Sequence, residues 1–195
     1  NQIMAISSID SKKIDIYRLN NDNDNWTIIG TINEKANSLA LSEDGKIIVI
    51  GNETDGYYYD KGKVDIYKYN SDNNWELIDS KIRGSGSNTF FGSSVAISNN
   101  GNIIAIGERG SNKVEIYKKD ILWNYVRVRD ISNSLTSDFG SNIKLSGNGL
   151  TLAVGSPEYN NHTGKINLIK FDINFNILIN REFVGDASNN KCGKN

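Results

Sequence analysis

The sequence predicts an all-β fold, a β-propeller segment built of four-stranded antiparallel blades. The first observation is a repeat of about 50 residues, seen most simply in Tyr17, Tyr67 and Tyr117, which are each 50 positions apart. The second is that each repeat holds four short apolar runs separated by turn residues. The third is that no segment keeps the 3.6-residue apolar period of a helix. Four strands in a repeat of this length are typical of a propeller blade.

The repeat at 81–130 shows the predicted elements in order. Its first two strands are joined by Asn99-Asn100-Gly101, and Asn-Gly supplies the positive φ angles that two-residue hairpin turns require. The third strand follows a variable loop, and the fourth begins after Trp123. The four predicted strands are 94–98, 102–106, 113–117 and 125–129.

The second and third strands differ in pattern, and therefore in predicted environment. Residues 47–50 and 103–106 are continuously apolar, which is typical of a strand covered on both faces. Residues 113–117 alternate apolar and polar side chains, which predicts one packed face and one more polar face. Trp26, Trp75 and Trp123 recur at the start of the fourth strand, where we expect them to pack between blades rather than to bind sugars.

The chain is predicted to be a single propeller segment over residues 1–195, because no interval has the composition of a linker. The pattern gives three full blades plus three strands of a fourth, so we expect a part of a larger propeller. The alternative is that other copies of the chain complete the open blade. The predicted repeats are approximately 1–30 (partial), 31–80, 81–130, 131–182 and 183–195, the last being the start of another blade.

Composition excludes several functional classes. The 22 basic and 23 acidic residues give a net charge of −1 without a basic stripe, so we expect no nucleic-acid partner. No apolar run approaches the roughly 18 residues of a membrane helix, so we expect no membrane span. A single cysteine, Cys192, cannot form an internal disulfide.

Two segments carry a resemblance to a known family. Phe91-Gly92 and Phe139-Gly140 each precede the pattern of a short strand, a glycine turn and a second apolar strand. With Gly155-Ser156-Pro157, this pattern resembles the FG-GAP repeat of integrin-α-type propellers and their bacterial relatives. The resemblance implies a propeller of about six to eight blades. One repeat departs from it, since Lys35-Ala36 stands where Phe-Gly is expected.

The loops after the second strand vary most between repeats, and variable loops on a rigid scaffold are where partner contacts are expected. Exposed tyrosines are enriched at interfaces, although a tyrosine loop folded over its own blade is an equally good interpretation. The candidate binding residues are Tyr57, Tyr58, Tyr59, Glu158, Tyr159 and His162.

The family resemblance also implies calcium loops at this place, with Asp-x-Asp-x-Asp-Gly spacing. No loop of this chain has that spacing, and calcium requires six to eight oxygen ligands. We therefore predict no cofactor. Asn52, Asp55 and Asp60 are weak candidates for calcium ligands.

We expect a non-catalytic interaction or structural module that presents loops to a protein or glycan partner on a cell, virion or extracellular surface. His162 is the only histidine and has no identifiable nucleophile as a partner, so a catalytic triad lacks support. The alternative is a fragment of a propeller enzyme, a glycosidase or lyase, with its active site in missing blades or the central channel. A third interpretation is a structural component that makes contacts through its outer strands.

Overall fold

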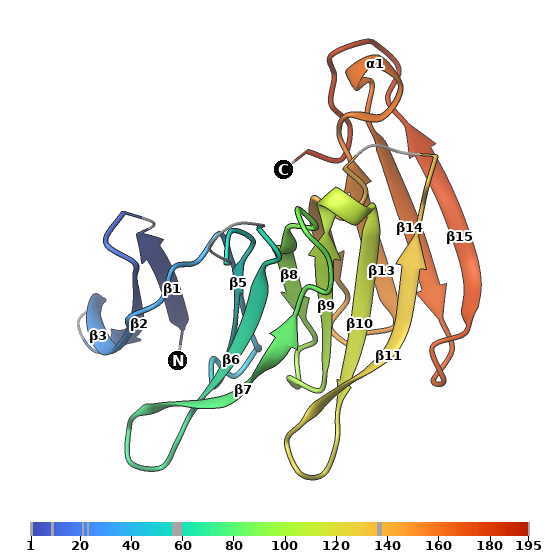
Figure 1. Cartoon of the computed structure of the whole chain (residues 1–195). Helices are drawn as coiled ribbons and strands as arrows, with labels where there is room; N and C mark the ends of the chain where they lie inside the picture. Colours follow the sequence, from blue (N-terminus) through green and yellow to red (C-terminus); the bar gives the residue numbers. More distant parts are fainter. Residues whose placement is uncertain are drawn as a thin grey trace.

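The computed structural model describes residues 2–8, 10–20, 22, 24–55, 60–135 and 138–194. These residues form four antiparallel sheets that follow one another across the molecule in chain order (Figure 1). We name them sheets I to IV. The all-β prediction of three four-stranded blades plus three strands of a fourth is confirmed.

Within each sheet the strands are paired in sequence order. Sheet I contains β1 (Ile3–Ser8), β2 (Lys13–Asn20) and β3 (Asn25–Ile32). Sheet II contains β4 (Ser38–Leu41), β5 (Ile47–Asn52), β6 (Lys63–Tyr69) and β7 (Trp75–Arg83). Sheet III contains β8 (Phe91–Ile97), β9 (Ile103–Glu108), β10 (Lys113–Lys119) and β11 (Tyr125–Ser132). Sheet IV contains β12 (Asn142–Leu145), β13 (Thr151–Ser156), β14 (Lys165–Phe171) and β15 (Ile177–Val184).

Helical structure within the described part of the chain is limited to two short turns. These are η1 (Arg109–Ser111) and α1 (Tyr159–His162), which follow the second strands of sheets III and IV.

Apolar cores lie between neighbouring sheets. In β5, Ile48 and Ile50 belong to the core shared with sheet I, whereas Ile47 and Val49 belong to the core shared with sheet III. All six residues of β5 are buried, and so are all six of β9. The continuously apolar second strand therefore lies between two other sheets, as its sequence predicts.

The hairpin loop between the first two strands is longer than the two-residue turn that its sequence predicts. In sheet III, the Ser98 N–H donates to the Ile103 carbonyl, and the Gly101 N–H donates to the Ser98 carbonyl at 2.9 Å. Only Gly101 has a positive φ, and a Cβ there would lie 2.3 Å from Ile47 of sheet II. Glycine is thus required both for the turn and for the close approach of the neighbouring sheet.

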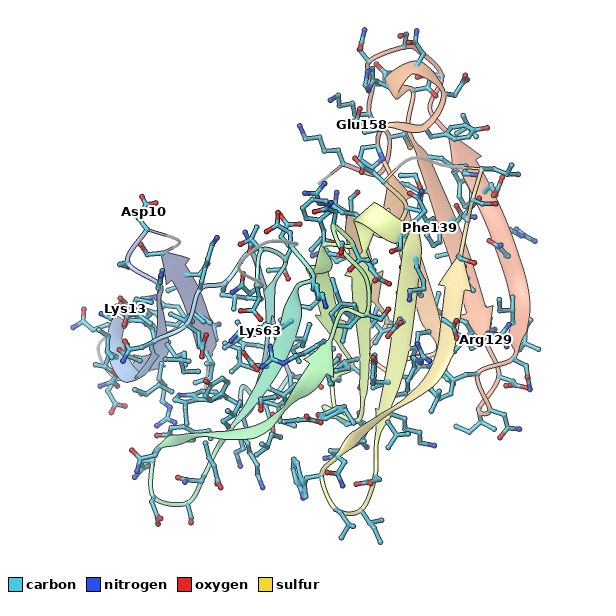
Figure 2. All side chains as sticks on the ribbon, viewed as in Figure 1. Asp10, Lys13, Lys63, Arg129, Phe139 and Glu158 are labelled. Atoms are coloured by element: carbon cyan, nitrogen blue, oxygen red, sulfur yellow. The ribbon has the colours of Figure 1, made fainter. Side chains whose placement is uncertain are left out.

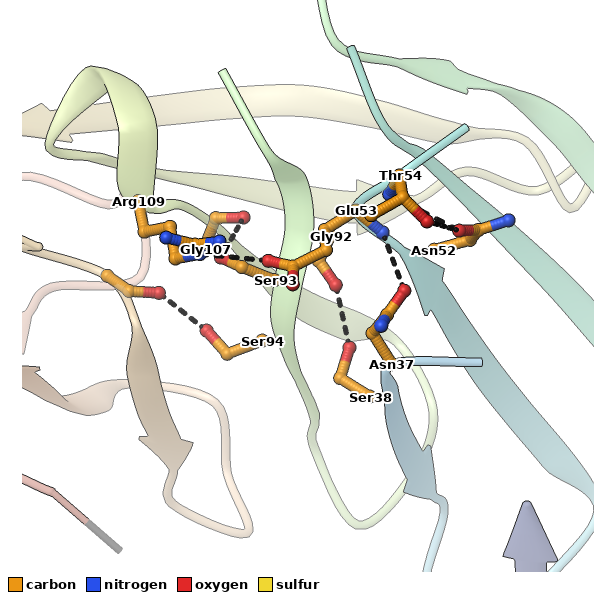
Figure 3. Close-up of polar contacts among 11 residues, drawn as sticks. Asn37, Ser38, Asn52, Glu53, Thr54, Gly92, Ser93, Ser94, Gly107 and Arg109 are labelled. Atoms are coloured by element: carbon orange, nitrogen blue, oxygen red, sulfur yellow. Dashed lines mark hydrogen bonds and ion pairs between the residues drawn. The ribbon is translucent and has the colours of Figure 1, made fainter. Parts of the chain in front are cut away.

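A repeated contact, which we call the glycine joint, connects each four-stranded sheet to the segment that follows it. In sheet III, the Ser94 hydroxyl donates to the Gly140 carbonyl at 2.7 Å (Figure 3). Gly107 lies opposite Ser94 in the sheet, and a Cβ there would be 2.0 Å from the same carbonyl oxygen. Gly140 itself has a φ of 88°. The joint therefore needs two glycines, one for space and one for backbone conformation.

The glycine joint recurs in sheets II and IV. In sheet II, the Ser38 hydroxyl donates to the Gly92 carbonyl at 2.8 Å, next to Gly51 (Figure 3). In sheet IV, the Asn142 side-chain amide donates to the Gly193 carbonyl at 3.3 Å. A Cβ on Gly155 would lie 2.1 Å from that carbonyl oxygen. The segment around Gly193 is therefore seated on sheet IV as Gly92 and Gly140 are seated on sheets II and III.

In two of the three joints the residue before the glycine is a phenylalanine that anchors the contact in an apolar core. Phe91 and Phe139 are each 1% exposed and pack into the cores of sheets II and III. Cys192 takes this place on sheet IV, and its smaller side chain stays partly exposed. The Phe-Gly pair is thus one unit, in which the ring fills the core and the glycine carbonyl closes the joint.

Two of the three tryptophans pack between sheets, as the sequence predicts. Trp75 packs against the core shared by sheets I and II and leaves no space for a Cβ on Gly30. Trp123 packs at the core between sheets II and III, with the Lys68 ammonium 3.8 Å from its ring centroid. Trp26 is 41% exposed, because no other sheet of the described residues covers its face.

Replacing Gly107 by alanine should test the glycine joint. The added Cβ would overlap a backbone carbonyl, which cannot move without displacing sheet IV, so we expect a loss of about 3 kcal/mol of unfolding free energy. Ser94→Ala removes only the hydrogen bond and should cost about 1 kcal/mol. Denaturant unfolding measures both changes. A Gly107→Ala protein as stable as the wild type would show that the joint is not a constraint.

Candidate functional site at the loop end of the sheets

In sheets II to IV the loops after the second strands lie at one end of the sheets, the upper end in Figure 1, which we call the loop end. Both helical turns, η1 and α1, belong to these loops. The hairpins between the third and fourth strands lie at the opposite end (Figure 1). The loop end therefore gathers the segments that differ most between the repeats.

A row of buried or half-buried ion pairs lies beneath these loops. A lysine begins the third strand of sheets II, III and IV and the second of the three strands of sheet I, and Figure 2 shows Lys13 and Lys63 near the loop end. In the first three sheets the lysine pairs with the acidic residue two positions later, at 2.7–2.9 Å. In sheet IV the lysine pairs with Glu182 of β15 at 2.8 Å. The four lysines are Lys13, Lys63, Lys113 and Lys165.

The densest network of this row is in sheet III. The Lys113 ammonium lies 2.6 Å from Glu108 and 2.8 Å from Glu115. Arg127 and the Tyr117 hydroxyl also donate to the Glu115 carboxylate. Burial of Glu115 opposes its ionisation, but these hydrogen bonds outweigh burial and hold its pKa below the ordinary value. Burial and the hydrogen bond to Glu115 raise the pKa of Tyr117 far above its usual range.

Neighbouring loops are tied to each other across the sheets. The Arg109 guanidinium in η1 lies 2.9 Å from the Glu53 carboxylate, which follows β5 of sheet II (Figure 3). The same guanidinium stacks 4.2 Å from the centroid of the Phe90 ring. The Glu53 N–H is held in turn by the Asn37 side chain at 3.2 Å. Loops of sheets II and III therefore share one supporting framework.

A polar cavity of about 390 Å³ lies at the loop end between sheets I and II. Lys63, in its wall, pairs with Glu34 at 3.1 Å as well as with Asp65. Burial opposes the positive charge of Lys63, but these two carboxylates outweigh burial and raise its pKa. Ammonium, carboxylate and amide groups line the cavity. Its lining residues are Lys12, Asn33, Glu34, Lys35, Asn52, Thr54, Asp55 and Lys63.

Two of the three residues considered for calcium line this cavity. The Asn52 side-chain oxygen accepts from the Thr54 N–H and hydroxyl, and Asp55 pairs with Arg83 at 3.0 Å. Asp60 lies elsewhere, and its carbonyl accepts from the Phe90 N–H. Among the residues that the structure describes, no three His, Cys, Asp or Glu side chains are grouped so that they could hold a metal ion.

The loop of sheet IV brings three predicted binding residues together. Glu158 contacts His162 through its carboxylate and pairs with Lys191 at 3.2 Å. The hydrogen bond from Lys191 and the charge of His162 lower the pKa of Glu158. Tyr159 lies close by, with the Lys165 ammonium 4.7 Å from its ring centroid. We name Glu158, Tyr159, His162 and Lys191 the Glu158 cluster.

The backbone under the Glu158 cluster has an unusual conformation. Asn160, Asn161 and His162 all have positive φ angles, between 44° and 63°. The segment after β15 holds this loop, because the Lys191 N–H donates to the His162 carbonyl at 2.9 Å and the Ser188 hydroxyl donates to the Asn161 carbonyl. Consecutive left-handed residues are costly unless their surroundings fix them, so these contacts position the cluster.

The three consecutive tyrosines, Tyr57, Tyr58 and Tyr59, lie outside the described residues. Three further residues of the loop end were not predicted, namely Arg109, Lys63 and Lys191. The lysine row had a visible signal, because Lys-x-Asp or Lys-x-Glu recurs at the start of the third strand. The Arg109–Glu53 and Lys191–Glu158 pairs had none, because their members are far apart in the chain.

The sequence matches no protein-family model and no curated protein sequence. Solved structures do resemble the fold. A putative 6-phosphogluconolactonase from Bacteroides uniformis has a TM-score of 0.68 at 17% identity, over 94% of this chain and 52% of its own. A hypothetical selenium-binding protein from Sulfolobus tokodaii has a TM-score of 0.63 at 12% identity, over 91% of this chain and 51% of its own.

A third similar structure is the complex of KlAtg21 with the coiled coil of AgAtg16, with a TM-score of 0.66 at 11% identity, over 95% of this chain and 55% of that one. The chain thus spans about half the length of these similar structures. At these identities the likeness shows a propeller-like fold. Within the described residues, no helix has the length and apolarity needed to cross a membrane.

Replacing Glu115 by glutamine should destabilise the fold at neutral pH by about 2 kcal/mol. The change removes one of the two buried counterions of Lys113, which keeps Glu108. It also removes the charged acceptor of Arg127 and Tyr117. The Glu115 pKa is lower in the folded chain, so its contribution is complete above the ordinary value of 4.5 and is lost as the pH falls below it. Unfolding measured from about pH 6 to about pH 3 should therefore show the gap between wild type and variant shrinking. Glu76→Gln, on the exposed side of β7, is the control. A constant gap would contradict the network.

Replacing Glu158 by glutamine should loosen the loop of sheet IV without unfolding the sheets. The Lys191 and Cys192 N–H groups donate to the His162 and Thr163 carbonyls, so their hydrogen exchange should accelerate once Lys191 is released. Exchange measured by NMR reports this locally, with amides of β9 as internal reference. Unchanged exchange at both positions would show that Glu158 does not hold the loop.

Proposed function

We propose that this chain is a non-catalytic propeller module that binds a protein or glycan partner through its loop end, on a cell, virion or extracellular surface. The observation that carries the proposal is the Glu158 cluster, whose ionisable side chains are partly exposed on a loop that the segment 186–192 holds in place. Rigid scaffolds that present variable loops are suited to recognition.

Two further features support this proposal. The polar cavity between sheets I and II offers donors and acceptors of the kind that hydroxyl or carboxylate groups of a glycan require. The Phe91-Gly92 and Phe139-Gly140 pairs resemble FG-GAP repeats, and we propose the same kind of surface role for this chain. The glycine joints provide a scaffold on which the loops can differ.

A propeller enzyme is the second candidate function, with a glycosidase or lyase activity as the sequence suggested. Its support from the comparisons is the name of one structurally similar protein, a putative 6-phosphogluconolactonase. Acceleration of δ-lactone hydrolysis by this chain, removed by variants of the loop end, would favour this candidate. A rate equal to the uncatalysed one would count against a lactonase activity of these four sheets.

Binding by the loop end can be tested on an array of immobilised glycans and on cell-surface protein extracts. A triple variant, Glu158→Ala with Tyr159→Ala and His162→Ala, should reduce the wild-type signal at least about tenfold, because it removes the charged and aromatic groups of the loop. Ile121→Ala with Leu122→Ala changes exposed side chains at the opposite end and is the matched control.

The control should retain the wild-type signal. Binding that the triple variant retains and the control loses would place the contact at the opposite end and overturn the loop assignment.

A further inference from the structure

Sheets I and IV each carry one apolar face that no other sheet of the described residues covers. Every other large sheet face is buried in one of the three cores. Contiguous apolar surface of this kind marks an interaction site. We call the open face of sheet I the head face and that of sheet IV the tail face.

The tail face repeats positions that are buried in the other sheets. Leu168 pairs with Ala153 in sheet IV as Ile116 pairs with Ala105 in sheet III. Ile116 is fully buried, whereas Leu168 is 37% exposed. Phe183 shows the same contrast, because it is 51% exposed and its counterpart in sheet III, Ile131, is 9% exposed. Leu168 and Phe183 thus occupy positions that are buried between two sheets elsewhere in the chain, but no sheet of the described residues covers them.

The head face shows the complementary pattern. Ile6 pairs with Asp15 in sheet I as Ile106 pairs with Glu115 in sheet III. Ile106 is fully buried against the preceding sheet, whereas Ile6 is 51% exposed. Trp26, the counterpart of the packed Trp75, also lies on this face. The head face thus carries the residues with which an inner sheet packs onto the sheet before it.

Between neighbouring sheets inside the molecule, a face of the tail type packs against a face of the head type. Ile66 and Ile82, the sheet II counterparts of Leu168 and Phe183, share a core with Ile106, the sheet III counterpart of Ile6. Between sheets III and IV, Ile116 and Ile131 share a core with Val154 in the same way. A tail-type face and a head-type face are therefore complementary in every inner contact of the chain.

The tail face also has a groove ready to receive a side chain. It has a volume of about 180 Å³ and lies beside the glycine joint of sheet IV. Ala153 and Ile166, which lie on the tail face, line it, and Gly193 lies at its edge.

We propose that the head face of one copy of this chain packs on the tail face of a second copy, in a head-to-tail contact that repeats the inner sheet contacts. The residues that make it are Ile6 and Trp26 of one copy and Leu168 and Phe183 of the other. The chain spans about half the length of similar solved structures, so two copies joined by two such contacts supply the sheets of one ring.

The contact can be tested with the 195-residue chain itself and two double variants. Ile6→Asp with Trp26→Asp disrupts the head face, and Leu168→Asp with Phe183→Asp disrupts the tail face. Ile121→Asp with Ile173→Asp alters exposed residues of two turns outside both faces and is the control. Circular dichroism and thermal unfolding confirm that each variant folds before its mass is measured.

Sedimentation from about 1 µM to about 100 µM should give the wild type and the control about twice the chain mass of 21.6 kDa. Either face variant alone should remain at the chain mass, with association weakened at least about 100-fold. An equimolar mixture of the two variants should form pairs, because one retains its tail face and the other its head face.

Three outcomes would overturn the proposal. A wild-type chain that stays at 21.6 kDa at every concentration would show that the head and tail faces do not bind each other between copies. A pair that survives in one face variant alone would be a contact between like faces, as in an isologous dimer. A mixture of two folded variants that does not associate would show that head and tail do not meet.

Discussion

The glycine joint is the constraint on which the rest of the structure depends. A carbonyl oxygen at the start of one sheet occupies the space where the preceding sheet would otherwise have a Cβ, and a serine hydroxyl or asparagine amide donates to it. An aromatic ring next to that carbonyl fills the core of the preceding sheet in two of the three cases. The distance between neighbouring sheets is therefore set by backbone contact. The apolar side chains fill the space that this distance leaves between the sheets.

The charged row beneath the loops depends on this spacing. Lys63 reaches Glu34 in the connection from sheet I, and Arg109 reaches Glu53 in the loop of sheet II, only because adjacent sheets hold fixed positions. Buried ion pairs contribute little net stability in general, but breaking one of them leaves a costly unpaired charge. The row of ion pairs therefore contributes mainly to the specificity of the fold, because any other arrangement of the loops would leave some of these charges unpaired. A recognition surface gains from such a base, because its loops lose less freedom on binding.

Much of the fold could be predicted from the sequence, and less of the candidate site. The 50-residue recurrence of Tyr17, Tyr67 and Tyr117 and the apolar runs at 47–50 and 103–106 were enough to predict blades, because strand burial leaves a periodic record. The hydrogen bond of the Ser94 hydroxyl could not be predicted in this way, because its acceptor lies 46 residues away in the sequence. Glu158 and His162 were predicted from one loop, but their partner Lys191 comes from a segment 33 residues later. Pairings across sheets depend on tertiary spacing, which a single sequence does not state.

The glycine joint also affects how the chain folds during its synthesis, because each joint is made by residues that follow the sheet they complete. Sheet II is closed by Phe91 and Gly92, which lie after its last strand, and sheet III is closed in the same way by Phe139 and Gly140. When synthesis has reached the end of β7, the core of sheet II therefore still lacks the Phe91 ring. We expect the core of sheet II to be completed only after the first residues of sheet III have been synthesised, so that the sheets gain their full stability in order from the amino end.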